Sequence, residues 1–348
     1  MRELIKKMKV INNKFSGKIE CISILRIIGA LGVALYHMGF LNGYVKSLQG
    51  GGSLFFTISG FLHMYTTQKE QKHFLVKRLI RIVPLYWIMT IATFAAMNVL
   101  PSMALGEADV TELIKSMFFI PYLRPAMKSA DVVRPMVGPA WTLYYDVYFA
   151  VLFYLCMKIN HRYRGLLASV VCIMLVILSE TKQFTSETPF LSIVVQKWWI
   201  SFTLGVSAFY ILRCLLKRGI LRNKSWRIAL ICISIISIIL LFIRPINLIE
   251  HGIYSFFAFV SLLLALYKTR MPKPVNKFGD FSYSFYLIHY YVIIVVDKVV
   301  NVHAFSMSAI LGSVVVITIS CTIAFVSYRL VECKFGDWMK RVLIRTNA

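Results

Sequence analysis

The sequence predicts an all-α integral membrane protein with about ten transmembrane helices. Of its 348 residues, 58% are apolar and only 16% are charged, whereas about a quarter of the residues in a soluble domain are charged. Apolar stretches long enough to cross a bilayer recur along the whole chain, and the mean hydropathy is +0.71; a spanning helix needs about 20 such residues. This apolar and aromatic content also excludes intrinsic disorder.

The apolar segments predicted to span the membrane cover residues 21–40, 51–67, 82–100, 138–157, 165–179, 190–212, 226–243, 252–267, 281–296 and 307–328. The first follows a basic leader, the second opens with glycines, the third begins behind a Lys/Arg cluster, and the fourth begins at Gly-Pro. Short basic or polar segments separate the other six. An even number of crossings places both termini on one side.

The net charge of +24 is explained by membrane topology. Most of the 39 Lys and Arg residues fall on segments that are inside when the amino terminus is cytoplasmic, as the positive-inside rule expects. Both termini are therefore predicted to be cytoplasmic, with residues 1–20 as a basic leader, 21–328 as the transmembrane domain and 329–348 as a tail. The excess charge favours anionic inner-leaflet lipid as a partner, and no nucleic acid is expected.

One connection is long enough to be structured, the outer segment 101–137. A short interfacial or re-entrant helix is expected within it at residues 112–122, because long connections without secondary structure are unusual unless they are functional. The seven cysteines are scattered, without Cys-x-x-Cys or a Cys/His cluster. They are predicted to be reduced and to serve as apolar filler, and no metal site is expected.

Ionisable side chains inside the predicted spans are functional candidates, because a charge at bilayer depth costs at least about 2.5 kcal/mol. They are Arg26, His37, Asp146, Lys197 and His289. For Lys197 two interpretations stay open, an ion pair or a cavity-lining position.

Arg26 and His37 are eleven residues apart in the first span. That separation is about 16.5 Å along a helix and close to three full turns, so both side chains point to one face. A guanidinium can hold an anionic or carbonyl group, and a histidine can take a proton from a hydroxyl near neutral pH. The pair favours a path from a cytosolic anionic donor to an outer acceptor. The alternative is that Arg26 reaches the inner headgroups and His37 caps the outer helix end.

Asp146 lies about eight residues into the fourth span, at a depth between Arg26 and His37. It is expected to neutralise one or orient the other, because a buried carboxylate needs a partner. Four aromatic side chains surround it in the sequence: Trp141, Tyr144, Tyr145 and Tyr148. They favour either a wall on which a sugar stacks or an interfacial aromatic belt.

Two further groups of polar side chains precede Asp146. Ser59-Gly60 places a hydroxyl in mid-membrane beside a point where helices can approach closely, and packing alone is the alternative. Arg78 and Arg81 are three residues apart, on one helical face, and match a phosphate-bearing ligand. Such clusters also serve simply as anchors at the inner membrane surface.

Several of these residues fit a set of family motifs in order. Arg26 and His37 fit Arg-x10-His, residues 55–61 fit Phe-Phe-x-x-Ser-Gly-Phe, and residues 78–86 fit Arg-x-x-Arg-Ile-x-Pro-x-Tyr. Residues 141–146 fit Trp-Ser/Thr-Leu-x-x-Glu with aspartate in place of glutamate, and residues 281–290 and 328–332 fit the closing motifs Tyr-Ser-x-Tyr-Leu-x-His and Arg-x-x-Glu. In these respects the chain resembles the membrane acyltransferase-3 family, whose members O-acylate bacterial surface glycans.

The resemblance implies an O-acyltransferase of the bacterial cytoplasmic (inner) membrane. It would move an acyl group, usually acetyl, from cytosolic acyl-CoA to a sugar hydroxyl of a surface glycan or its lipid-linked precursor. Acetyl-CoA would be a co-substrate, with no tightly bound cofactor. The catalytic residues implied are His37 as base, Arg26 as its partner along the acyl path, and Asp146; the substrate-binding residues implied are Arg78, Arg81, Ser59, Tyr86, Trp141 and His289. Arg78 and Arg81 would hold the CoA phosphates.

Direct attack of the sugar hydroxyl on the thioester is the favoured mechanism, with a covalent acyl-enzyme on Ser59 or His37 as the less favoured route. An alternative of another class is a transporter or flippase of a lipid-linked saccharide, with Arg26, His37 and Asp146 along its path. Labelled acetyl-CoA separates the two, because only an enzyme leaves the label on a glycan.

Overall fold

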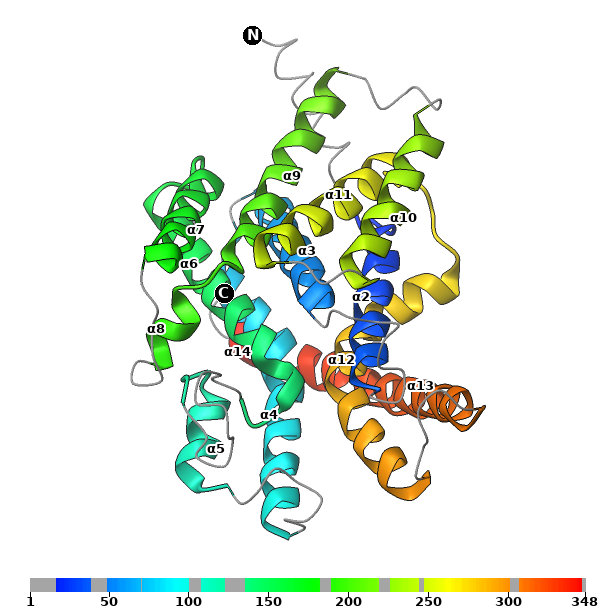
Figure 1. Cartoon of the computed structure of the whole chain (residues 1–348). Helices are drawn as coiled ribbons and strands as arrows, with labels where there is room; N and C mark the ends of the chain where they lie inside the picture. Colours follow the sequence, from blue (N-terminus) through cyan, green and yellow to red (C-terminus); the bar gives the residue numbers. More distant parts are fainter. Residues whose placement is uncertain are drawn as a thin grey trace.

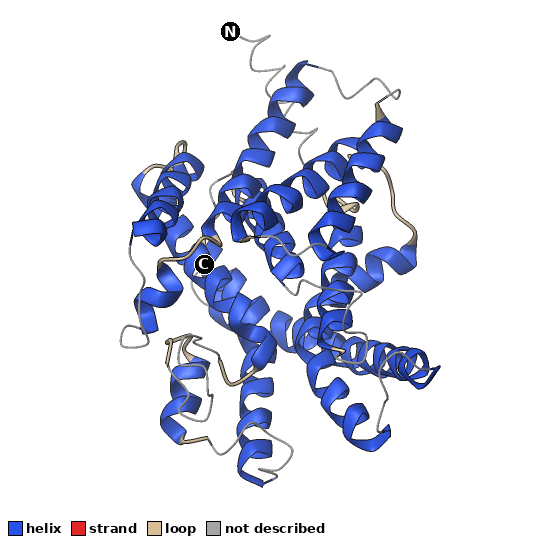
Figure 2. Ribbon diagram, viewed as in Figure 1, coloured by secondary structure: helices blue, strands red, loops and turns tan. Residues whose placement is uncertain are grey.

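A computed structural model describes residues 17–38, 49–69, 71–99, 108–122, 135–181, 189–218, 226–243, 247–300 and 307–345. Throughout these ranges the regular secondary structure is helical and no strand is formed (Figure 2). The all-α fold class predicted from the sequence is confirmed. Most of the predicted leader 1–20, and parts of the outer segment 101–137, lie outside the described residues.

Each predicted span coincides with a helix. The bounds are α2 Ile22–His37, α3 Gln49–Thr66, α4 Phe74–Val99, α6 Trp141–Ile159 behind a 3₁₀ turn Gly138–Ala140, α7 Arg164–Thr181, α8 Pro189–Val194 with α9 Trp199–Arg218, α10 Arg227–Ile243, α11 Leu248–Leu266, α12 Lys273–Val300 and α13 Met307–Ser327 (Figure 1). Within the described ranges, six helical segments are long and apolar enough to cross a membrane, and α2 and α10 are shorter apolar helices. Ten crossings and cytoplasmic termini stay predictions.

The outer segment contains the short helix expected there. This helix, α5 Val110–Met117, begins two residues earlier than predicted, behind Asp109, whose carboxylate accepts a hydrogen bond from the Glu112 N–H at 2.6 Å. An aspartate at the N-cap satisfies one of the unpaired N–H groups of the first turn. The Tyr86 hydroxyl of α4 donates to the Ser116 carbonyl at 2.8 Å and so fixes α5 to the bundle.

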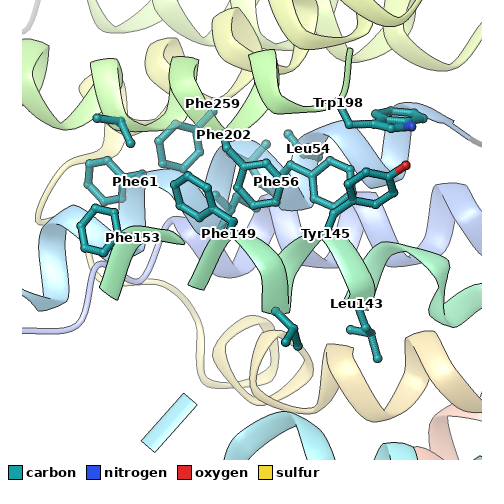
Figure 3. Close-up of a cluster of buried hydrophobic side chains, with 14 of the residues drawn as sticks. Leu54, Phe56, Phe61, Leu143, Tyr145, Phe149, Phe153, Trp198, Phe202 and Phe259 are labelled. Atoms are coloured by element: carbon teal, nitrogen blue, oxygen red, sulfur yellow. The ribbon is translucent and has the colours of Figure 1, made fainter. Parts of the chain in front are cut away.

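A row of aromatic rings fills the centre of the bundle. Figure 3 shows Phe56 of α3 and Phe149 of α6 on either side of Phe202 of α9; the ring centroids of Phe56 and Phe202 are 4.7 Å apart, and those of Phe149 and Phe202 are 4.4 Å apart. Lipid tails are as apolar as these rings, so helix association in a membrane depends on such close packing rather than on the hydrophobic effect. The row joins α3, α6 and α9.

Two glycines allow α3 and α9 to touch at the backbone. A Cβ on Gly60 would lie 2.2 Å from the Phe202 carbonyl oxygen, and a Cβ on Gly205 would lie 2.1 Å from the Thr57 carbonyl oxygen. Neither position has room for a methyl group. The packing interpretation of Ser59-Gly60 is therefore correct for Gly60. Ser59 lies one residue before this contact between α3 and α9.

The last membrane helix does not stop where the tail was predicted to begin. After α13 the chain continues as a π-helix over Tyr328–Phe335 and then as α14 Gly336–Arg345. π-helical turns are rare and occur often at functional sites. Here the π-helix carries Glu332, whose carboxylate accepts a hydrogen bond from Ser284 of α12 at 2.5 Å.

Candidate active site

A cavity of about 130 Å³ lies where α2, α3, α4, α6 and α12 meet. Its polar wall contains Arg26, Ser59, Arg78, Arg81, Asp146 and Ser282. The rest of the wall is apolar or aromatic and includes Phe55, Phe56, Tyr283 and Tyr286. Among the lining residues that the structure describes, three guanidinium groups face one carboxylate, so the cavity carries positive charge suited to an anion.

Arg78 and Asp146 form an ion pair inside this cavity. The Arg78 Nη2 atom lies 2.5 Å from the Asp146 Oδ1 atom, and the two side chains are 20% and 17% exposed. The Ser59 hydroxyl donates to the same Oδ1 atom at 2.6 Å and accepts from Arg78 Nη2 at 2.7 Å. The sequence predicted that Asp146 neutralises Arg26 or orients His37. In the structure the Asp146 carboxylate pairs with Arg78 instead, so the predicted partner of Asp146 is wrong.

His63 extends this network away from the cavity. It lies one helical turn after Ser59 on α3, is fully buried, and its Nδ1 atom is 2.7 Å from the Ser59 carbonyl and 3.3 Å from the Ser59 hydroxyl. Phe74, Phe149 and Phe153 surround its ring at centroid distances of 4.9–5.4 Å. The sequence showed His63 only as a residue near a helix end. The four-residue spacing from Ser59 was the signal that identifies this contact.

Arg26 and Arg81 have a different electrostatic environment from Arg78. No salt bridge to either guanidinium forms among the residues described. Both lie within electrostatic range of Glu332, the acidic residue that the π-helix turns towards α12. Arg81 is exposed and Arg26 is half-buried. Among the residues described, these two arginines are thus the cavity's cations without a carboxylate in salt-bridge contact.

His37 and His289 meet next to this cavity. The His37 Nδ1 atom lies 3.0 Å from the His289 Nε2 atom, and the ring centroids are 5.2 Å apart. Neither histidine lines the cavity, but Tyr286 does, and its ring centroid lies 6.0 Å from that of His289. The histidine pair is one helical turn beyond the cavity along α12, a rise of about 4.5 Å.

The other predicted site residues lie elsewhere. Tyr86 is fully buried, and its hydroxyl is bonded to Ser116 on α5. Trp141 packs on Trp198, with ring centroids 5.1 Å apart, and neither residue lines the cavity. Tyr144 and Tyr145 are core residues rather than a cavity wall or an interfacial belt. Lys197 pairs with Glu180 at 2.8 Å, which matches the ion-pair interpretation.

The geometry divides the site into two chemically different parts. The arginine cavity can bind an anionic or carbonyl group, and the histidine pair can accept a proton from a neutral nucleophile. In the described part of the chain, no group of three or more His, Cys, Asp or Glu side chains could hold a metal ion.

Comparison with known proteins identifies one family and one relative. The family model described as an acyltransferase domain matches residues 19–329, nearly the whole chain. A segment of 125 residues is 27% identical to the exopolysaccharide production protein ExoZ of Rhizobium meliloti (strain 1021), covering 34% of this chain and 38% of that protein. No solved structure matches. The chain therefore aligns with less than half of the length of ExoZ.

Proposed function

The chain belongs to the membrane acyltransferase-3 family, and we propose that it transfers an acyl group, acetyl in the first instance, from acyl-CoA to a sugar hydroxyl. The acceptor would be a surface polysaccharide or its lipid-linked precursor, and the site would be the bacterial inner membrane. The observation that carries the proposal is the arginine cavity lying one helical turn from a histidine pair. The likeness to a protein named for exopolysaccharide production supports a glycan acceptor.

The proposed donor site is the arginine cavity. Arg81 is exposed and Arg26 is half-buried in its wall, an arrangement in which Arg81 holds CoA phosphate while Arg26 contacts the thioester end. Guanidinium groups form strong, charge-assisted hydrogen bonds with phosphate oxygens. Arg78 contributes positive charge, but its Nη2 atom is already engaged by Asp146 and Ser59. The phosphate clamp expected from Arg78 and Arg81 together is thus assigned mainly to Arg81.

The proposed chemical step is direct attack. His37 takes the proton of the sugar hydroxyl as the hydroxyl oxygen bonds to the thioester carbonyl carbon. The carbon–sulfur bond then breaks, and the CoA thiolate leaves and is protonated to the free thiol. Arg26, which lines the donor cavity, would stabilise the negative charge that develops on the carbonyl oxygen. The acyl ester of the sugar is the product.

The decisive experiment uses purified protein in nanodiscs with radiolabelled acetyl-CoA and polysaccharide from the producing cell. Covalent label on the glycan, with one free CoA thiol released per label, is the expected result. A transporter or flippase would instead move a lipid-linked saccharide across the bilayer and leave it unlabelled. Mass spectrometry of the cell-surface polysaccharide with and without the gene then identifies the modified sugar.

A further inference from the structure

The histidine pair has a defined direction of hydrogen bonding. His289 is fully buried on α12, and its Nδ1 atom lies 3.2 Å from the Phe285 carbonyl oxygen one turn earlier. A carbonyl oxygen only accepts hydrogen bonds, so His289 Nδ1 carries the proton and donates. In a neutral imidazole the other nitrogen is then an acceptor. His289 Nε2, 3.0 Å from His37 Nδ1, then accepts a hydrogen bond from the His37 Nδ1–H group.

The opposite arrangement is disfavoured by the same contacts. If His289 Nε2 carried the proton and donated to His37, the lone pair on His289 Nδ1 would face the lone pairs of the Phe285 carbonyl at 3.2 Å. That repulsion would occur at a fully buried position, where unsatisfied polar groups are costly. When His37 Nδ1 carries the proton, it donates to His289 Nε2, and His289 Nδ1 donates to the Phe285 carbonyl, so each of these polar groups has a partner.

We propose that His289 is a positioning residue: it holds His37 in the tautomer protonated at Nδ1, so that Nε2 is the atom that takes the proton from the acceptor hydroxyl. This deepens the proposed function and rests on it. In catalytic triads a carboxylate fixes the tautomer of the catalytic histidine; here a neutral imidazole does so. His289, predicted from the sequence to bind substrate, would then act through His37.

The packing of α2 on α12 explains why the pair is held in register. At the cytoplasmic end predicted for both helices, a Cβ on Gly279 would lie 2.4 Å from the Ser23 Cβ, so the helices are in close contact there. Lys18 pairs with Asp280 at 2.6 Å. Glu20 accepts hydrogen bonds from the Asn276 side chain and the Met271 N–H, both at 2.7 Å, and these bonds lower the pKa of Glu20.

Further along the two helices, apolar contacts continue to the histidines. Ala30, Ala34, Phe285 and Ile288 belong to one buried cluster between α2 and α12. The ring of Tyr290 lies edge-on to His37, with centroids 5.3 Å apart. The imidazole of His37 is thereby fixed in plane as well as in position, as a proton acceptor requires.

The test compares His289→Leu with His289→Gln in full-length protein containing ¹⁵N-labelled histidine. Leucine removes the hydrogen-bond acceptor of His37. The Oε1 atom of glutamine can occupy the place of His289 Nε2 and accept the same hydrogen bond from His37 Nδ1–H. His251→Leu, which removes a buried imidazole from α11, controls for the general cost of that loss. The His37 resonances are those absent from the spectrum of His37→Gln.

We expect nitrogen NMR to show His37 protonated at Nδ1 in the wild type, in His289→Gln and in His251→Leu, and a mixture of tautomers in His289→Leu. In the acyl-transfer assay, His289→Leu should lower kcat by about 10²-fold, within the range of general-base catalysis. His289→Gln should recover most of that loss. The KM for acyl-CoA should change less than about threefold, because the donor cavity does not contain His289.

Two results would overturn the inference: a wild-type His37 protonated at Nε2, or a His289→Gln variant as impaired in kcat as the leucine variant at equal amounts of folded protein. The wild-type spectrum decides the first even if the leucine variant does not fold. Because the spectrum requires no substrate, the expected tautomer in a protein that transfers no acyl group would refute the proposed function and leave the hydrogen bond intact. Acyl transfer by a protein with the other tautomer would refute the inference alone.

Discussion

Replacing Asp146 with asparagine removes the only carboxylate among the described residues that line the arginine cavity. Asparagine keeps an oxygen that can accept the hydrogen bond from the Ser59 hydroxyl. The change therefore removes the negative charge of the Arg78–Asp146 pair and tests that charge alone. Breaking a fully buried pair costs about 3–5 kcal/mol, whereas an exposed pair contributes about 0–1 kcal/mol. Because both side chains are about one-fifth exposed, we expect a loss of about 2–3 kcal/mol in the free energy of unfolding, between those limits.

A double-mutant cycle measures the pair directly. Arg78→Gln alone leaves Asp146 without its cation, and the double variant removes both charges. The unfolding free energy of the four proteins, measured by titration with SDS in mixed micelles, should give a coupling energy of about 1–3 kcal/mol. The double variant should therefore be more stable than the sum of the two single losses predicts.

Activity provides the second measurement of the same change. Asp146→Asn should be nearly inactive at matched protein level in the membrane, because Arg78 then repels the neighbouring Arg26 and Arg81. Asp146→Glu keeps the charge and restores the residue of the family motif, so most activity should remain. A coupling energy below about 0.5 kcal/mol, the usual error of additivity, would refute the reasoning, as would an asparagine variant at least as active as the glutamate variant.

The other predictions concern the base, the donor site and the helix contact. His37→Ala should lower the rate of acyl transfer by at least about 10²-fold without loss of expression, and a remaining rate above about a tenth would exclude it as the base. Arg81→Gln should raise the KM for acyl-CoA while kcat changes little, since a contact remote from the reacting carbonyl holds ground and transition states alike; equal binding of CoA and dephospho-CoA by the wild type would contradict a phosphate contact. Gly60→Ala should lower the free energy of unfolding by about 1–3 kcal/mol or more, because the new methyl group meets the Phe202 backbone. In its control, Gly336→Ala, the new Cβ would lie 3.7 Å from the Val331 carbonyl oxygen, an ordinary contact distance, so this variant should retain wild-type thermal stability in detergent.

The fold could be predicted from the sequence because its signals are local. Long apolar runs, glycines and prolines identify helices and their ends without any knowledge of packing. The short helix in the outer segment was expected from the length of that connection, and its true start at Val110 follows the Asp109 cap. The π-helix after Ser327 has no comparable signal. Charged residues begin there, at Arg329, Glu332 and Lys334, and this change in composition predicts the end of the membrane span rather than a continued helix.

The partners within the site could not be predicted, because helix packing decides them. Asp146 and Arg78 are 68 residues apart, and spacing along one helix gives no information on which neighbouring helix presents its cation. The Arg26–His37 spacing correctly places both on one side of α2, yet the two side chains lie in different parts of the site. His63 is the exception, since its position four residues after Ser59 follows from helix geometry alone.

The separation of cations from imidazoles has a chemical consequence. If all three arginines surrounded His37, their charge would oppose the imidazolium that forms when His37 takes a proton. Instead Asp146 neutralises Arg78, Arg26 and Arg81 remain in the cavity with Glu332 nearby, and His37 faces a neutral histidine one helical turn away. The proposed donor site can thus stay positive enough to hold CoA phosphate while the proposed base stays neutral enough to accept a proton. Arg81 variants should therefore act mainly on KM and histidine variants mainly on kcat, a division that a single mixed site would not produce.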